Sequence, residues 1–393
     1  MLKYIKGNDF MEQTITELHT HLMGILPADK FLSFLSQYTD CIYWPIDEPI
    51  SNATQTIPIS SAIYDKEVLD SLRIVHGTQA DYLTLNNMYA TRTELLKLVT
   101  RKVATTLSER LKDEHLDFSE DKKEQVIQQQ AEQAVYNNYI NCCLEELVSQ
   151  GVKYAEISYS NFKKTLGYSI REDLKDKITC KFLLSTDRSR STRNIKQQVK
   201  DLKKAMDSGN FVGVDIMGLE VPFSEADLDY SNSRSFQKKL EILLAELRQH
   251  DDTTLRIHSG EVPGSNNTII TLQMLNQIAE TKGIVIPPPE IRIGHGTHFT
   301  PSKEYIDLLK KFECVVEINA SSNFGLKNIQ NYEDIPYSYY LENNIPIVLT
   351  TDGNGMYDTT ISQENEIARK HTTTEQYETI LKTDDEILER KVK

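Results

Sequence analysis

The chain has 393 residues, of which 39% are hydrophobic and 26% are charged, so it can bury a sizeable core and wholesale disorder is excluded. Its 58 acidic and 44 basic residues leave a formal net charge of −14, which excludes general binding of nucleic acid or of an anionic membrane. The first residues lack the apolar core of a signal peptide, no stretch approaches a transmembrane helix, and the five cysteines have no zinc-finger spacing. We therefore expect a cytoplasmic protein with free thiols.

Eight short apolar runs, rich in β-branched residues, recur along the chain and predict β-strands. Most are separated by segments of helical periodicity, and alternating strands and helices are typical of a parallel sheet. Eight such units favour a (β/α)8 TIM barrel that forms a single domain over residues 1–393, with a doubly wound sheet as the alternative. The predicted strands are 15–22, 152–160, 178–186, 211–220, 253–261, 290–296, 314–321 and 345–352, and the clearest predicted helices are 195–208, 236–250, 269–282 and 302–312.

A long insertion, residues 40–150, follows the first predicted strand. Residues 40–61 contain several prolines and the only tryptophan, Trp44, and show no clear period, which predicts a loop. Residues 81–148 are rich in Leu, Glu, Gln and Lys and predict two or more helices. In a barrel this segment leaves the end of the first strand where active sites lie, so it is a candidate lid, with a plain surface excursion as the alternative. The residues after Thr372 predict one charged helix.

Histidines and a carboxylate lie at the ends of three predicted strands. His19 and His21 alternate on the first strand, so both imidazoles share one face and can ligate one cation, although two hydrogen-bonded core histidines also fit this pair alone. His258 ends the fifth strand region and Asp352 ends the eighth. Three imidazoles and one carboxylate suit Zn²⁺ or another first-row dication with a position left for water. The four side chains converge only if the strands close into a barrel.

Two further groups are candidates for proton transfer. Glu261 follows His258 by three residues and is a candidate general acid, with a helix N-terminal carboxylate or a surface salt bridge as the alternative. His295 stands between Gly294 and Gly296, which let a ligand approach closely, and it is a candidate to take a proton from an attacking water. A satisfied buried histidine is the alternative for His295.

Four motifs in order resemble the adenosine/AMP deaminase family of metal-dependent hydrolases, over about residues 15–366. They are HTHLMG at 19–24, HSGE at 258–261, GHGTH at 294–298 and TD at 351–352. The resemblance implies a (β/α)8 barrel and one zinc ion held by His19, His21, His258 and Asp352.

The resemblance also implies the chemistry. Glu261 would protonate N1 of a purine, and His295, assisted by Asp352, would orient and deprotonate the water that attacks C6, after which ammonia leaves. His21 would also lie at the substrate, and Gly218, at the end of the fourth predicted strand, would offer backbone contacts to the purine edge. The expected partner is thus a small purine nucleoside or nucleotide, with no nucleic acid and no membrane.

Residues 351–357 and 360–364 are similar to the adenosine-deaminase-like branch that acts on N6-methyl-AMP. Arg188 and Arg190 lie just beyond the third predicted strand, and arginine side chains bind phosphate bidentately, so they are candidates to hold a nucleotide phosphate. A solvated basic loop is the alternative for these arginines.

The sequence departs from the family at Gly353, where a second carboxylate usually holds N7 of the purine. We therefore expect plain adenosine to be a poorer substrate than a phosphorylated or N6-modified relative. Replacing Gly353 with Asp would restore the contact only if the backbone there can accept a Cβ, which a positive φ would prevent.

The sequence thus favours zinc-dependent hydrolytic deamination at C6 of an adenine nucleoside or nucleotide, with release of ammonia or an amine and an inosine product. The alternatives are another metal-dependent amidohydrolase on the same scaffold, or a non-catalytic subunit that senses a nucleotide. The presence of both Glu261 and His295 argues against the last alternative. The sequence leaves the oligomeric state and assembly with other subunits open.

Overall fold

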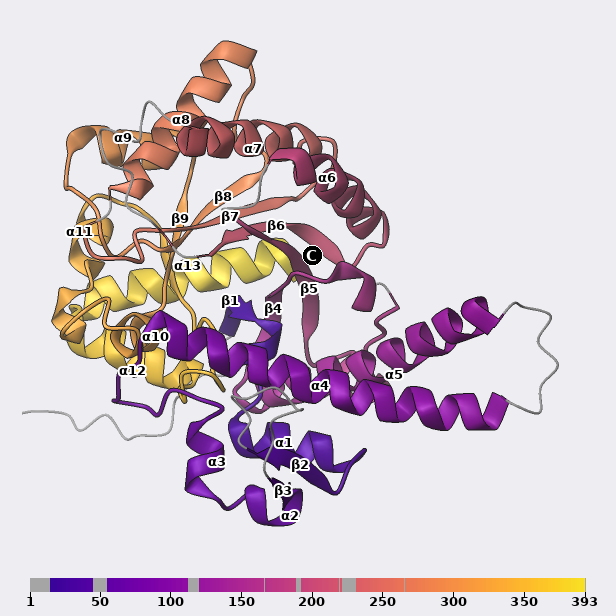
Figure 1. Ribbon diagram of the computed structural model, residues 1–393. Helices are drawn as coiled ribbons and strands as arrows, with labels where there is room; N and C mark the ends of the chain where they lie inside the picture. The colour runs from indigo at the N-terminus through magenta and orange to yellow at the C-terminus, as the bar shows by residue number, and fades with distance from the viewer. Residues whose placement is uncertain are drawn as a thin grey trace, which may run out of the picture.

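The main sheet consists of eight strands in the order β1-β4-β5-β6-β7-β8-β9-β10, and each pairs in parallel with its neighbour. In this computed structural model the described residues are 15–44, 55–111, 120–165, 167–188, 192–218, 220, 231–264 and 266–392 (Figure 1). A parallel bridge between Thr20 and Asp352 brings the last strand region back to the first, so the barrel is nearly closed. The predicted (β/α)8 barrel is therefore confirmed. The strands are β1 Ile15–His21, β4 Val152–Tyr159, β5 Thr179–Asp187, β6 Phe211–Met217, β7 Thr254–Ser259, β8 Glu290–His295, β9 Val315–Ile318 and β10 Ile347–Leu349.

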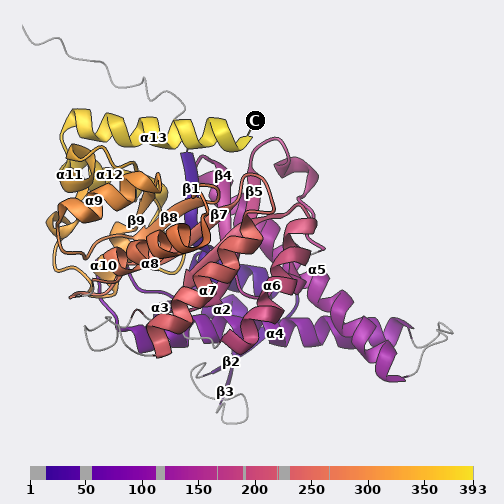
Figure 2. The same cartoon turned by 90° about the horizontal axis from the view of Figure 1, so that it is seen from above.

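Helices surround the barrel (Figures 1 and 2). Their apolar side chains are buried in the core. On α7, for example, Leu240, Leu243, Leu244 and Leu247 recur at helical spacing and are all buried. The helices are α1 Ala28–Ser36, α2 Ile59–Ala62, α3 Lys66–Asp70, α4 Tyr82–Leu111, α5 Glu120–Ser149, α6 Thr192–Asp207, α7 Ser231–Leu247, α8 Asn267–Lys282, α9 Lys303–Lys311, α10 Ala320–Gly325, α11 Tyr337–Glu342, α12 Ile361–His371 and α13 Thr374–Val392. Within the described residues, no helix is long and apolar enough to cross a membrane.

The charged tail forms α13, as predicted, and covers one end of the barrel (Figure 2). Ile387 and Leu388 join a small buried cluster with Leu18 of β1 and Val348 of β10. This end carries the N-terminal ends of the strands, because Asp384 of α13 bonds Thr16 near the start of β1. The C-terminal strand ends therefore form the opposite, accessible mouth of the barrel.

The insertion differs in part from the sequence prediction. Its first part was predicted as loop, but β2 (Cys41–Trp44) and β3 (Gln55–Pro58) form an antiparallel pair, so that prediction is wrong for these residues. Hydrogen bonding between β2 and β3 stabilises these two strands, although the local sequence pattern does not indicate them. The second part forms two helices as predicted, α4 and α5, which run side by side and extend well beyond the barrel (Figure 1).

Candidate active site

The four predicted metal ligands converge at the C-terminal mouth of the barrel. His19 and His21 lie on β1, His258 lies on β7, and Asp352 follows β10. The ring centroids of His19 and His258 are 4.5 Å apart, and those of His21 and His258 are 5.3 Å apart. Asp352 Oδ1 lies 3.1 Å from His21 Nε2 and 3.5 Å from His19 Nε2. Barrel closure therefore brings together ligands that are widely separated in the sequence.

His295 and Asp352 adopt left-handed backbone conformations at this mouth, with φ of 68° and 61°. Such conformations are uncommon outside glycine and concentrate at functional sites. Two side chains of α10 hold these residues: Ser322 Oγ donates to Asp352 Oδ2 at 2.7 Å, and Asn323 Oδ1 lies 3.1 Å from His295 Nδ1. Residues 320 and 321 were predicted to end a strand, but they begin α10, which was not predicted. The polar Ser-Ser-Asn sequence after β9 was a usable signal for it.

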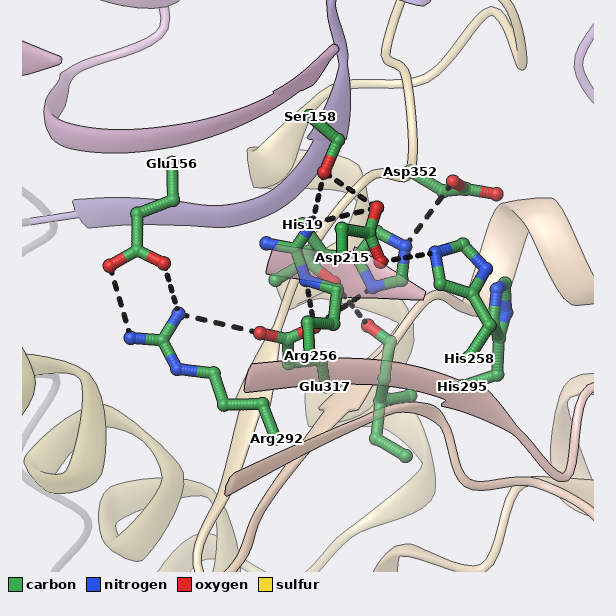
Figure 3. A network of polar contacts seen from close by, with 12 residues as sticks. His19, Glu156, Ser158, Asp215, Arg256, His258, Arg292, His295, Glu317 and Asp352 are labelled. Atoms are coloured by element: carbon green, nitrogen blue, oxygen red, sulfur yellow. Dashed lines mark hydrogen bonds and ion pairs between the residues drawn. The ribbon is translucent and has the colours of Figure 1, made fainter. Parts of the chain in front are cut away.

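A network of buried charges fills the barrel beneath the histidines (Figure 3). Glu317 Oε2 lies 2.9 Å from both His19 Nδ1 and Arg256 Nε. Asp215 Oδ1 lies 3.2 Å from His258 Nε2, and Asp215 Oδ2 accepts a hydrogen bond from Ser158 Oγ at 2.6 Å. These carboxylates orient two of the predicted ligand rings. A buried charge is stable only when it is paired with an opposite charge or a hydrogen-bond donor. Both Glu317 and Asp215 have such partners.

The same network extends away from the site through a second arginine. Arg292 Nη1 lies 2.9 Å from Glu156 Oε2 and 3.4 Å from Glu317 Oε1. This network was not predicted from the sequence. The available signal was the presence of charged residues inside strands that are otherwise apolar, at positions whose side chains point into the barrel.

The pKa shifts in the cluster favour an ionised carboxylate with positive charge beside it. Burial raises the pKa of Asp352, but hydrogen bonds from His19 and His21 outweigh it and hold this pKa well below its usual value. Burial lowers the pKa of His258 to about 4, which keeps it neutral. Burial and Arg256 also lower the pKa of His19, but Asp352 and Glu317 outweigh them and raise it to about 9, so positive charge is favoured here.

The donor atoms also suit a metal. Within the described residues, His19 Nε2 and His295 Nε2 are buried and have no hydrogen bond of good geometry. Ligand atoms of His19, His21 and His258 lie within 4.8 Å of one another, as do those of His19, His295 and Asp352. Nitrogen and carboxylate donors in this number are those that Zn²⁺ takes.

Glu261 lies beside His295, with its Oε2 at 3.7 Å from His295 Nε2. Its backbone amide donates to Glu220 Oε2 at 2.8 Å, and the Gly260 amide donates to Glu220 Oε1 at 2.9 Å. The buried Glu220 thus fixes the loop that carries the candidate acid, a role that the sequence analysis did not assign. The candidate acid and base therefore lie next to one another beside the predicted metal ligands.

A cavity of about 430 Å³ opens directly onto this cluster and is large enough for a small organic ligand. His21, His258, Glu261 and Asp352 line its inner end. One wall comes from α4, whose pocket-facing residues recur every three or four positions and so share one helix face. These residues are Tyr82, Leu85, Asn86, Tyr89, Thr93 and Lys97.

The predicted substrate contacts fall in different places. Gly218 lines the cavity, with φ of 103°. The Arg188 guanidinium donates to the backbone carbonyls of Gly218, at 3.1 Å, and of His258, and it does not line the cavity. Arg190 lies outside the described residues. The cations that line the cavity within the described residues are Lys97 and Lys164, which the sequence analysis did not single out.

Gly353 has φ of 147°, a conformation that residues with a side chain rarely adopt. A Cβ at this position would lie 3.2 Å from the Cα of Gly24, which is a tight contact with backbone. The backbone therefore does not readily accept the carboxylate side chain that the sequence resemblance leads one to expect here.

Comparison with known proteins gives one consistent family. A family model described as Adenosine deaminase matches residues 113–382, more than half of the chain. The N6-methyl-AMP deaminase-L of Xenopus laevis is 27% identical over 240 residues, which cover 58% of this chain and 62% of that protein. An adenosine deaminase of Clostridium botulinum (strain 657 / Type Ba4) is 26% identical over 240 residues, which cover 58% of this chain and 64% of that protein. In both cases the match spans less than two thirds of the relative.

Among solved structures, the Arabidopsis ADAL structure complexed with IMP superposes with a TM-score of 0.58 at 16% identity. The superposition covers 94% of this chain and 90% of that chain. At this level of identity the likeness establishes the fold, and it agrees with the barrel described above.

Proposed function

Because the chain belongs to the adenosine deaminase family, we propose that it is a zinc-dependent aminohydrolase that acts at C6 of an adenine nucleotide, N6-substituted nucleotides included. The observation that carries this proposal is the convergence of three imidazoles and one carboxylate with a candidate acid and base at the inner end of one cavity. The products would be an inosine nucleotide and ammonia or an amine.

We assign the metal to His19, His21, His258 and Asp352, whose donor atoms and charges fit a dication. When bound, such an ion supplies a Lewis acid that brings the pKa of a coordinated water to roughly 7. Glu317 and Asp215 serve the site by fixing the ring orientations of His19 and His258.

Proton transfer falls to Glu261 and His295, whose side chains lie next to one another beside the predicted metal ligands. Glu261, at the cavity wall, donates a proton to the ring nitrogen N1, which makes C6 more electrophilic. His295 takes the proton of the attacking water through Nε2, because its Nδ1 faces Asn323. Asp352, held by Ser322, supports the orientation of that water.

The far end of the cavity suits a phosphate. Lys97 reaches it from α4, and the Lys164 ammonium lies 4.4 Å from the Tyr136 ring centroid, which holds the cation in place. Lys97 lies eight residues along α4 from Tyr89, about 12 Å at 1.5 Å per residue, so base and phosphate can be bound together. Arg188 does not line this cavity and donates to two backbone carbonyls, so we assign the phosphate to the two lysines.

The test is a substrate panel. Zinc-loaded protein is incubated with adenosine, AMP, ATP and N6-methyl-AMP, and released ammonia or methylamine is measured, with Glu261→Gln as the matched inactive control. We expect release from at least one nucleotide, and weaker release from adenosine. Hydrolysis of amides or esters without amine release would instead favour the amidohydrolase alternative. Nucleotide binding without any turnover would favour a sensing subunit.

A further inference from the structure

We infer that Tyr89, on the α4 wall of the cavity, is a specificity-determining residue that donates a hydrogen bond to N7 of the purine. This inference rests on the proposed function and extends it to a residue supplied by the insertion. Tyr89 lines the cavity together with Asp352 and Glu261, so its side chain reaches the end where the chemistry takes place.

Two glycines make room for the Tyr89 hydroxyl. A Cβ on Gly24 would lie only 2.9 Å from Tyr89 Oη, and a Cβ on Gly353 would lie 3.4 Å from it. Both glycines flank the metal cluster in the sequence, since Gly24 follows β1 and Gly353 follows Asp352. The hydroxyl of Tyr89 thus lies next to the space that a side chain at position 353 would enter.

The hydroxyl is available as a donor. Within the described residues, Tyr89 Oη has no hydrogen-bond partner, and a tyrosine hydroxyl keeps its proton at neutral pH. A hydroxyl at a cavity wall that is shielded from bulk water is costly to leave unpaired once a ligand fills the cavity. The ligand therefore has to present an acceptor to Tyr89.

The order of groups along α4 identifies that acceptor. Tyr82 contacts the candidate acid Glu261, and its hydroxyl accepts a hydrogen bond from Asn328 Nδ2 at 3.1 Å. Tyr89 lies two helical turns further along the same face, beside Asp352 and Gly353. In adenine, C6 lies between N1 and the N7 edge, and the 6-amino group shares its edge with the acceptor N7. With N1 at Glu261 and C6 at the metal cluster, N7 faces Tyr89.

The experiment compares each purine nucleotide with its 7-deaza analogue, in which a C–H replaces N7. We expect Tyr89→Phe to lower kcat/KM for the purine nucleotide by about tenfold, the scale of one lost hydrogen bond at a buried site. The same substitution should leave the 7-deaza nucleotide within about twofold, because that substrate has no acceptor for the hydroxyl. Tyr64→Phe, at a tyrosine that is 86% exposed, is the matched control and should change neither value.

A binding measurement separates this inference from the proposed function. The dissociation constants of IMP and 7-deaza-IMP are measured by calorimetry for the wild type and Tyr89→Phe. The inference is supported if the wild type binds IMP more tightly than 7-deaza-IMP and Tyr89→Phe loses this preference. This result would stand even if no adenine nucleotide is deaminated, in which case only the proposed function fails. Equal losses on both ligands, or no preference in the wild type, would overturn the inference while leaving deamination intact. Absence of both turnover and binding would overturn both.

Discussion

At the scale of single residues, the pair Glu261 and His295 carries the proposed chemistry. Glu261 Oε2 lies 3.7 Å from His295 Nε2, and both side chains are buried. Glu261 follows β7, whereas His295 ends β8. Neither is required to bind the metal in the proposed assignment. Their substitution should therefore separate catalysis from metal binding.

The first prediction concerns the acid. Glu261→Gln keeps the shape of the side chain but cannot donate the same proton, so we expect kcat to fall by about 10²-fold or more while bound zinc is unchanged. Activity and elemental analysis on the same preparation provide the check. Loss of zinc in Glu261→Gln would instead make Glu261 a ligand or a support for one.

The second prediction concerns Arg188. Its guanidinium donates to the carbonyls of Gly218 and His258, which join the ends of β6 and β7. We therefore expect Arg188→Ala to lower kcat/KM about equally for nucleosides and nucleotides, by roughly tenfold, as for lost hydrogen bonds to a charged group. If the loss falls on nucleotides alone, Arg188 binds phosphate as the sequence analysis predicted.

At the scale of elements, α4 connects the insertion with the site. Its apolar residues Leu95, Leu96 and Val99 are buried in the core, while its pocket face carries polar residues and the cation of Lys97. One helix therefore both packs on the barrel and forms a wall of the cavity. This arrangement supports the proposal that the insertion acts as a lid.

The third prediction tests the phosphate end of that wall. Lys97 is partly exposed and pairs with Glu94 at 2.6 Å, so its removal should cost little stability. We expect Lys97→Ala to raise KM for nucleotides by roughly tenfold and to leave adenosine unchanged, because only nucleotides carry the phosphate. Lys102→Ala, further along α4 and bonded to Thr39, is the matched control. An equal rise in KM for adenosine would contradict a role in phosphate binding.

At the scale of the whole molecule, the metal would tie together strands from opposite ends of the chain. His19 and His21 lie on β1, whereas Asp352 follows β10, and the barrel closes between these two strands through one bridge and the hydrogen bond from Asp352 N to His19 O at 2.8 Å. A bound ion would strengthen this junction. Closure and metal binding should therefore be coupled.

The fourth prediction follows from this coupling. Because an ion that binds only the folded chain stabilises it, we expect a chelator to lower the unfolding temperature by several degrees and zinc to restore it. At a thousandfold excess over its dissociation constant the ion contributes about 4 kcal/mol. Thermal unfolding followed by circular dichroism, with elemental analysis for about one zinc per chain, provides the check. An unfolding temperature insensitive to chelation, with full activity retained, would contradict the metal assignment.

The fifth prediction concerns α13 at the opposite end of the barrel. Partial burial outweighs the hydrogen bonds from Thr16 and raises the pKa of Asp384 to about 7. The folded chain therefore holds this proton while the unfolded chain releases it near pH 4, so its contribution to stability is lost as pH rises from about 4 to about 7. We expect Asp384→Asn to reduce this loss by on the order of 1–2 kcal/mol, after allowance for partial exposure.

Urea unfolding at a series of pH values tests this directly. Glu378→Gln, at an exposed position on the same helix, is the matched control and should leave the pH dependence unchanged. Parallel stability profiles for wild type and Asp384→Asn across this pH range would contradict the prediction.

The sequence alone determined the elements and the reactive groups. The eight strands and the clearest helices were predicted within a few residues, because local periodicity and burial on both faces of a parallel sheet leave a strong pattern. His19, His21, His258 and Asp352 were predicted to be metal ligands because each stands near a strand end with a motif around it. Their convergence followed once closure of the barrel was assumed.

Tertiary structure alone decided what surrounds these groups. The pairing of Glu317 with His19 and Arg256 depends on which strands become neighbours, and the approach of Tyr89 to Gly24 and Gly353 depends on how α4 packs over the mouth. The local sequence does not predict such contacts. They form between segments that are distant in the sequence, and they depend on strand register and on how helices lie against the barrel rather than on local periodicity. The family motifs indicated the chemistry, whereas the fold determined which side chains meet the substrate.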